Sequence, residues 1–204
     1  MALKIFAFNC SLKPSPAESS TDKLLGEILD EFKTYDGTGE ILRAVDFNIK
    51  PGVTSDEGEG DDWPALRKKV LAADVFVVGV PIWMGQPSSV CKRVLERMDA
   101  FLSEKDNQQR MPPYGRVGLV AVVGNEDGAH HVSAEVFQAL NDVGFSLPPN
   151  AMTYWVGEAM GSKDYKDFKT SPKTTTHATA MMVAAAAHLA GVLKRETYPG
   201  LKEK

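Results

Sequence analysis

Residues 75–80 read Val-Phe-Val-Val-Gly-Val and form the clearest strand of the chain. Their side chains are apolar and mostly β-branched, without the alternation of apolar and polar residues that marks a strand with one face in water. A strand that is apolar on both faces is typical of a parallel sheet covered by helices on both sides. Pro81 is expected to end the strand, because proline has no N–H for the sheet ladder.

Other apolar runs of strand length lie on both sides of this one, and segments with helical spacing separate them. Strands are predicted at residues 3–8, 41–45, 75–80, 117–123 and 152–155. A first helix is predicted to follow the capping residues 19–22 and to end in a turn at 36–39, and later helices are predicted at about 63–73, 87–98, 129–143 and 174–193. The strict alternation predicts an α/β fold with a parallel sheet, in one domain over residues 1–204.

Composition excludes several classes of protein. The chain has 204 residues, 43% of them apolar and 25% charged, which is typical of a globular protein. A net charge of −4 argues against nucleic-acid binding. No apolar run approaches the ~20 residues of a membrane span, and the N-terminal segment is too short for a signal peptide, so a cytoplasmic location is expected. Cys10 and Cys91 are expected to be ordinary thiols, and no metal site is predicted.

In parallel α/β sheets, ligands bind at the carboxyl ends of the strands, so the loops there are the first place to look for function. The loop after the first strand runs from Cys10 to Thr21 and is rich in hydroxyls. It leads into a helix start, whose unpaired N–H groups and positive dipole end favour anions, and Lys13 adds a positive charge. These features predict a site for a terminal phosphate. The alternative is an ordinary N-cap in a loop rich in serine and proline.

Two further loops fall at the same predicted edge of the sheet. Residues 81–89 place large apolar side chains, Trp83 and Met84, just before Gly85, which indicates a platform for a flat aromatic ring. The alternative is that both side chains plug the end of the sheet. Residues 124–128 read Gly-Asn-Glu-Asp-Gly, and their glycines would let the backbone approach a ligand closely. The alternative for this third loop is a simple turn with Asp127 as the helix cap.

Together these loops resemble the NADPH-dependent FMN reductase branch of the flavodoxin-like superfamily. Ser11-Leu12-Lys13 with Ser20-Thr21 resembles the G-S-x-R…N-T phosphate loop of that family. Pro81-Ile82-Trp83-Met84-Gly85 with Ser88 resembles its P-I-Y-x-G-x-x-S loop. The chain departs from the pattern where Cys10 replaces the usual glycine and Lys13 replaces the frequent arginine, which loses the planar fork that grips phosphate. The cysteine cluster of iron–sulfur flavoproteins is absent from the sequence.

The resemblance implies a three-layer flavodoxin-like fold with a five-stranded parallel sheet in the order 2-1-3-4-5. It implies FMN as cofactor and NAD(P)H as co-substrate, with ping-pong hydride transfer to a quinone, a free flavin or a similar small acceptor. It also implies a homodimer or homotetramer. No general acid or base is assigned, because the redox chemistry belongs to the cofactor. The alternative is a flavodoxin-type electron carrier without a small-molecule substrate.

The resemblance also assigns site residues. The flavin phosphate would contact Ser11, Lys13, Ser19, Ser20 and Thr21. The ring would lie on Pro81, Ile82, Trp83, Met84 and Gly85 and on Gly124, Asn125, Glu126, Asp127 and Gly128.

Four other segments carry weaker signals. Residues 47–62 are expected to form a mobile surface loop with solvated acids. The aromatic connection 157–169 is expected to pack on the sheet edge, with a cover over the acceptor or a nicotinamide site as the alternative. His130 and His131 are expected to be surface or capping residues. The Ala-rich helix at 174–193 indicates either a subunit contact or close packing on the sheet.

Overall fold

Five parallel strands form the centre of the molecule in the order β2-β1-β3-β5-β6. The computed structural model describes residues 2–158 and 161–202. The strands are β1 (Leu3–Asn9), β2 (Gly37–Arg43), β3 (Val75–Trp83), β5 (Val117–Gly124) and β6 (Met152–Val156). All four pairings between them are parallel, and β4 (Gln86–Pro87) is a short antiparallel partner of β3. The predicted order 2-1-3-4-5 is confirmed, since the fifth predicted strand is β6.

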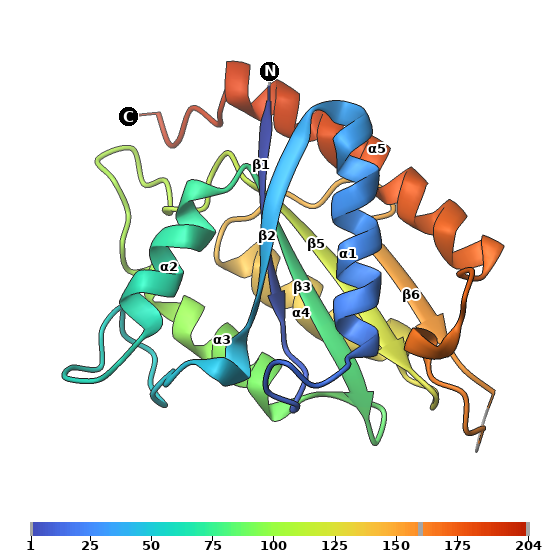
Figure 1. Cartoon of the computed structure of the whole chain (residues 1–204). Coiled ribbons are helices and arrows are strands. Elements are labelled where there is room, and N and C mark those ends of the chain that lie inside the picture. The colour runs from blue at the N-terminus through green and yellow to red at the C-terminus, as the bar shows by residue number, and fades with distance from the viewer. Residues whose placement is uncertain (1, 159–160, 203–204) are drawn as a thin grey trace.

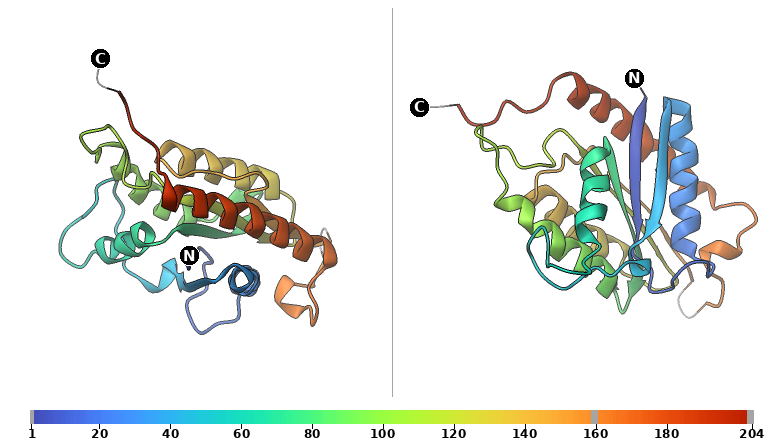
Figure 2. Two further views of the ribbon diagram at one scale, coloured as in Figure 1. Left: turned by 90° about the horizontal axis from the view of Figure 1, so that it is seen from above. Right: turned by 60° about the vertical axis from the view of Figure 1, so that its left-hand side comes forward.

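Helices cover both faces of this sheet and produce the three layers of a flavodoxin-like α/β fold (Figures 1 and 2). One face carries α1 (Ser20–Phe32) and α5 (Lys173–Arg195), and the other carries α2 (Trp63–Ala72), α3 (Ser89–Met98) and α4 (Ala129–Asp142). Short 3₁₀ helices lie at Lys33–Tyr35, Ala44–Asp46, Asp99–Leu102 and Tyr165–Asp167. A separate apolar core fills the space on each side of the sheet.

The second strand begins earlier than the sequence predicts. Residues 37–39 belong to β2 and pair with β1, whereas they were expected to form a turn. A side chain on Gly37 would approach Phe32 to 2.9 Å, and one on Gly39 would approach the Ile5 carbonyl oxygen to 2.5 Å. These glycines therefore serve close packing rather than a turn, and the prediction of a strand at 41–45 was wrong in its bounds.

Pro81 does not end β3, which continues to Trp83. On one side, pairing with β1 stops at Gly79, so no partner strand needs an N–H from Pro81 there. On the other side, Pro81 stays in register with Val123 of β5. The strand then turns into the short hairpin with β4, which the apolar pattern alone does not indicate.

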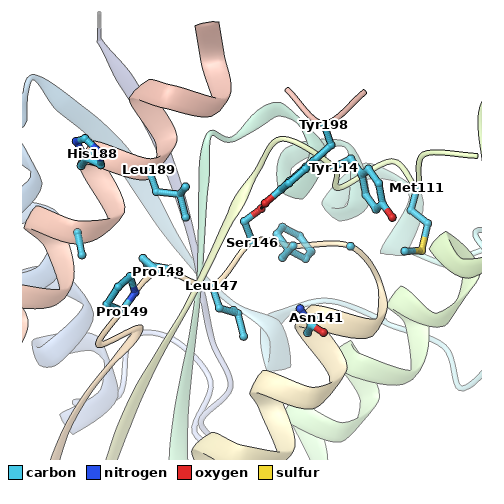
Figure 3. Close-up of a pocket in the computed structure, with 13 residues that line it drawn as sticks. Met111, Tyr114, Asn141, Ser146, Leu147, Pro148, Pro149, His188, Leu189 and Tyr198 are labelled. Atoms are coloured by element: carbon cyan, nitrogen blue, oxygen red, sulfur yellow. The ribbon is translucent and has the colours of Figure 1, made fainter. Parts of the chain in front are cut away.

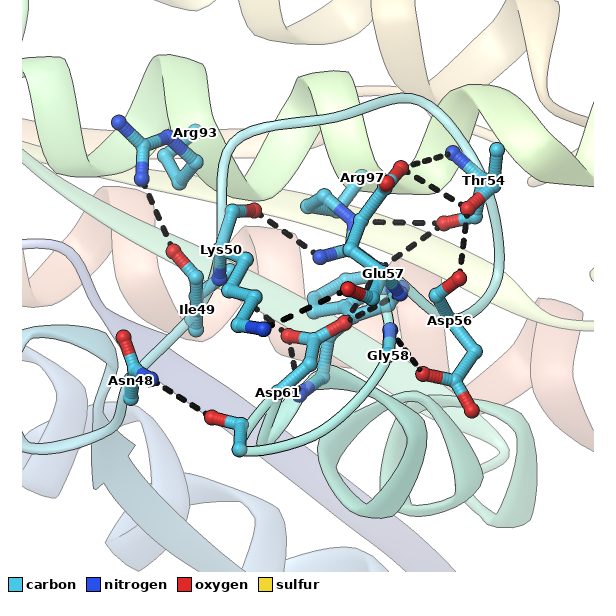
Figure 4. Close-up of polar contacts among 12 residues, drawn as sticks. Asn48, Ile49, Lys50, Thr54, Asp56, Glu57, Gly58, Asp61, Arg93 and Arg97 are labelled. Atoms are coloured by element: carbon cyan, nitrogen blue, oxygen red, sulfur yellow. Dashed lines mark hydrogen bonds and ion pairs between the residues drawn. The ribbon is translucent and has the colours of Figure 1, made fainter.

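The acidic segment at 47–62 is tied to the fold by a buried ion pair (Figure 4). Arg97 of α3 contacts Asp61 at 2.7 Å, and both side chains are fully buried. Arg97 also donates to the carbonyl oxygens of Lys50 and Thr54. Burial opposes the charge on Asp61, but hydrogen bonds from Arg97 and three backbone N–H groups prevail and lower its pKa to about 2. The expectation that all these acids are solvated was wrong for Asp61.

Helix α5 is long and apolar enough, by length and composition alone, to cross a membrane, with a mean hydropathy of 1.3 over its best window. In the fold it packs against α1, β5 and β6. Its buried residues include Met182, Val183 and Ala186, whereas Met181 on its outer side is 45% exposed. The helix therefore serves as a covering layer of the sheet. A subunit contact through its outer side stays a prediction.

Candidate functional site

A cavity of about 370 Å³ opens at the carboxyl ends of β1, β3 and β5, where all three predicted loops meet. It is lined by residues from each loop, from β6 and from the segment that follows β6. The lining residues are Ser11, Leu12, Lys13, Glu18, Ser19, Ser20, Thr21, Pro81, Ile82, Trp83, Val123, Gly124, Asn125, Glu126, Trp155, Asp164, Tyr165 and Lys166. Of the predicted site residues, only Met84, Gly85, Asp127 and Gly128 lie outside this lining.

The first loop presents the start of α1 to the cavity. Ser19 is the N-cap, and its hydroxyl accepts the N–H of Asp22 at 3.3 Å. The N–H groups of Ser20 and Thr21 belong to the first helical turn, which has no intrahelical partners for them. Within residues 2–158 and 161–202, no hydrogen bond uses either group. Two N–H donors at the positive end of a helix thus lie at residues that line the cavity.

The second loop is a tight hairpin turn. Met84 and Gly85 have φ angles of 51° and 72°, so both lie in the left-handed region that such turns require. Ile82 is buried, whereas Trp83 is 50% exposed and Met84 is 88% exposed. Neither large side chain plugs the end of the sheet, so that alternative was wrong. Trp83 lines the cavity, and Met84 projects from the tip of the turn.

The third loop packs directly on the second. The Glu126 carboxylate accepts the N–H of Met84 at 2.9 Å. Gly128 has a φ angle of 130°, and a side chain there would come within 2.8 Å of the Gly85 Cα. Gly128 therefore lets the backbones of the second and third loops touch. The resemblance assigned Gly128 to ligand contact, but the structure gives it a packing role. Gly124, Asn125 and Glu126 are the members of this loop that reach the cavity.

A fourth wall comes from the end of β6 and the segment after it. That segment was expected to pack on the sheet edge, with a cover over the acceptor or a nicotinamide site as the alternative. Trp155 and Tyr165 line the cavity, with ring centroids 5.6 Å apart. The Lys166 N–H donates to the Ser20 hydroxyl at 3.2 Å, and Lys23 donates to the Tyr165 carbonyl at 3.2 Å. Packing alone is thus an incomplete interpretation of the 157–169 connection, of which residues 159–160 lie outside the described part. Aromatic residues flanking that segment were the signal in the sequence.

The Tyr165 hydroxyl in this wall donates a hydrogen bond to a Glu27 carboxylate oxygen at 2.6 Å. Burial, together with this bond to a carboxylate, raises the pKa of Tyr165 well above its usual range. The phenol therefore stays neutral and serves to fix the segment on α1.

The remaining candidates lie away from the cavity lining. His130 packs against Tyr154, and His131 contacts Glu135 at 2.8 Å, in keeping with surface roles. The Cys10 and Cys91 thiols are both buried, and the hydrogen bond between them and their burial raise the pKa of Cys10. Such thiols are unreactive. Among residues 2–158 and 161–202, no group of three or more His, Cys, Asp or Glu side chains is placed to hold a metal ion.

A larger cavity of about 810 Å³ lies at the opposite end of the sheet (Figure 3). It is lined mainly by apolar and aromatic side chains, including Tyr114, Phe145, Leu189 and Tyr198. Among the described residues that line it, none belongs to a helix start and none is a predicted site residue. The smaller cavity is therefore the one that combines predicted site residues with N–H groups at a helix start.

A family model described as NADPH-dependent FMN reductase matches residues 3–160. The chain belongs to the NADPH-dependent FMN reductase family. FMN is accordingly its cofactor and NAD(P)H its co-substrate. The features that carry the resemblance, two loops after β1 and β3, are also the ones that converge on the cavity.

The relatives are named for different activities. The chain is 32% identical to the 8-demethyl-8-aminoriboflavin-5'-phosphate synthase of Streptomyces davaonensis, over 97% of this chain and 81% of the relative. A crystal structure of RosB with a bound 8-demethyl-8-formylriboflavin-5'-phosphate intermediate superposes with a TM-score of 0.87 at 30% identity, covering 96% of this chain and 82% of RosB.

A third relative is much longer. Over 81% of the present chain, the sequence is 38% identical to a Mycobacterium bovis protein named divalent metal cation transporter MntH. The match spans only 25% of that protein. It therefore covers a segment of the named transporter and carries nothing about metal transport.

The residues around the cavity fit FMN. A flavin phosphate needs N–H and O–H donors, which the helix start and the hydroxyls of Ser20 and Thr21 offer. An isoalloxazine ring needs a flat apolar slot, which Pro81, Ile82 and Trp155 border. Both sets of residues line one cavity, with the phosphate donors on the first loop and the apolar border on the others.

Proposed function

We propose that this protein is an FMN-dependent oxidoreductase that uses NAD(P)H to reduce a quinone, a free flavin or a similar small acceptor in a ping-pong reaction. The observation that carries the proposal is the convergence of the 11–21, 81–83 and 124–126 loops on one cavity. FMN supplies the redox chemistry when bound. The chain itself binds and orients the flavin and leaves an open side for the second substrate.

The phosphate would bind at the start of α1. The free N–H groups of Ser20 and Thr21 would donate to its oxygens, and the Ser20 hydroxyl is free to donate because its oxygen already accepts the Lys166 N–H. Lys13 lines the cavity and forms no ion pair among residues 2–158 and 161–202, so its charge is available to a dianion. Lys166, by contrast, is neutralised by Asp167 at 2.9 Å.

The ring would bind between the 81–83 and 124–126 segments, with Trp155 along one border. The Glu126 carboxylate holds the Met84 N–H and so fixes the two loops relative to each other. Trp83 lines the cavity and is half exposed, so it would contact an aromatic acceptor. No side chain at the cavity is assigned as a proton donor.

Steady-state kinetics test this proposal. The FMN-loaded protein is assayed with NADH and with NADPH against a panel of quinones, azo dyes, nitroaromatics and free flavins. A ping-pong mechanism predicts parallel lines in double-reciprocal plots at several acceptor concentrations. Failure of both nicotinamides to support turnover with every acceptor would contradict the proposal and would favour an electron carrier.

A second candidate function is the modification of a flavin 5'-phosphate that the cavity holds as a substrate. Its support is the similarity to the Streptomyces synthase and to RosB, over nearly the whole chain. Incubation of the protein with 8-demethyl-8-formylriboflavin-5'-phosphate and an amine donor, followed by mass spectrometry of the released flavin, separates the two. A flavin recovered with altered mass indicates flavin modification, whereas an unaltered flavin with NAD(P)H turnover indicates a reductase.

A further inference from the structure

Arg43, the last residue of β2, reaches into the loop that precedes α1. Its side chain is 8% exposed, and all five of its N–H donors are used. The Nη1 group donates to the carbonyl oxygens of Lys13 at 3.1 Å and Pro14 at 2.8 Å. The Nη2 group donates to the Ala17 carbonyl oxygen at 2.5 Å. Three carbonyls of one loop thus converge on a single guanidinium.

The same guanidinium pairs with a carboxylate at the start of α1. Arg43 Nε donates to Asp22 at 2.8 Å, and Nη2 contacts the same oxygen. The other oxygen of Asp22 accepts from the side chain of Asn9. Asn9 in turn accepts the Ser11 N–H at 2.8 Å. The network therefore ties the end of β1, the loop and the helix start to Arg43.

This arrangement has two electrostatic consequences for an anion. Carbonyl oxygens carry partial negative charge, and those of Lys13, Pro14 and Ala17 are committed to Arg43. Asp22 would place a full negative charge in the first turn of α1, next to Ser20 and Thr21. Its pairing with Arg43 compensates that charge.

We infer that Arg43 is a positioning residue that makes the 11–21 loop selective for a phosphate group, acting through the backbone and Asp22 without touching the ligand. The inference rests on the proposed placement of the FMN phosphate at this loop. It predicts that loss of Arg43 weakens binding of FMN much more than binding of riboflavin, which has the same ring and no phosphate.

The test compares FMN and riboflavin affinities by quenching of flavin fluorescence on titration with apoprotein. In Arg43→Met, the FMN dissociation constant should rise about tenfold or more, while that of riboflavin should change less than about threefold. Lysine cannot reproduce the planar fork of arginine, so Arg43→Lys should also lose FMN affinity selectively, but by a smaller factor than Arg43→Met. Arg43→Lys replaces Arg43→Met in this test if the methionine variant does not fold.

Arg116 provides a matched control. Arg116 is half-buried and, like Arg43, donates to three backbone carbonyl oxygens, those of Leu71, Pro112 and Tyr114, but it lies at the other end of the sheet. Arg116→Met should leave the ratio of FMN to riboflavin affinity unchanged.

Equal losses for both flavins in the Arg43 variants, or no loss for either, would overturn the inference and leave the proposed function standing. A wild-type protein that fails to bind FMN would overturn the proposed function and the inference with it.

Discussion

Gly128 provides a demanding test of how the flavin loops are held together. In Gly128→Ala, the new Cβ would lie 2.8 Å from the Gly85 Cα and 2.9 Å from the Gly85 carbonyl oxygen, both of them backbone atoms that cannot rotate away. The φ angle of 130° is also one that alanine rarely adopts. Strain of this kind costs about 1–3 kcal/mol, and the backbone contact adds to it.

We therefore expect Gly128→Ala to lower the free energy of unfolding by about 3 kcal/mol. Separation of the second and third loops should also disturb the ring site and raise the FMN dissociation constant about tenfold. Urea denaturation followed by circular dichroism measures the first quantity, and flavin fluorescence quenching measures the second.

Gly26 supplies a control of opposite sign. It lies inside α1, and apart from the neighbouring backbone of the helix itself nothing would lie within 4 Å of a Cβ placed there. Gly26→Ala should raise the free energy of unfolding by about 0.5–1 kcal/mol through helix propensity and leave FMN affinity unchanged. A Gly128→Ala protein as stable as wild type, with wild-type FMN affinity, would refute the packing argument.

Three further predictions follow from the geometry. The double variant Ser20→Ala, Thr21→Val should weaken FMN binding about tenfold or more and leave riboflavin binding unchanged. Valine keeps the γ-methyl of Thr21 that packs against Gly79. Unchanged FMN affinity would mean that the phosphate binds elsewhere. Arg97→Met should lower the free energy of unfolding by about 3–5 kcal/mol, because it leaves the Asp61 carboxylate buried without its ion-pair partner. A decrease below about 1 kcal/mol in urea denaturation would contradict the buried ion pair between Arg97 and Asp61. The pKa of Asp61 falls from 3.8 to about 2 on folding. Its ionised carboxylate should therefore stabilise the wild type by about 2 kcal/mol above pH 3.8, and this stabilisation should disappear as the pH falls through 2. A difference in free energy of unfolding between wild type and Asp61→Asn that does not vary from pH 5 to ~2 would contradict this.

The parallel sheet could be predicted from sequence because apolar runs of strand length alternate with segments of helical spacing, whereas the order of its strands came from the family resemblance. What the sequence did not predict were features that depend on contacts distant along the chain. Gly37 and Gly39 look like turn residues until β1 is placed beside them. Pro81 looks like a strand end until the pairing of β1 is seen to stop at Gly79. Single-domain organisation, oligomeric state and cytoplasmic location stay predictions.

The candidate site likewise combines features that local sequence predicts with features that depend on contacts distant along the chain. The hydroxyls after β1 and the Pro-Ile-Trp run at the end of β3 are local signals. Eleven of the fifteen predicted residues line the cavity because the segments that hold them lie at the carboxyl ends of β1, β3 and β5. Met84 and Gly128 were assigned to ligand contact by motif, yet one projects from a hairpin and the other serves loop packing. Arg43 was missed because it stands in no motif, and only the folded chain brings it to the loop before α1. Tyr165 belongs to the aromatic connection that was expected to pack on the sheet edge, and it lines the cavity.

A crystal structure of the protein with FMN tests the central claim most directly. The account predicts phosphate oxygens about 3 Å from the N–H groups of Ser20 and Thr21, with the ring between the 81–83 and 124–126 segments. A phosphate bound elsewhere, for example in the cavity beside Tyr198 at the opposite end of the sheet, would contradict it.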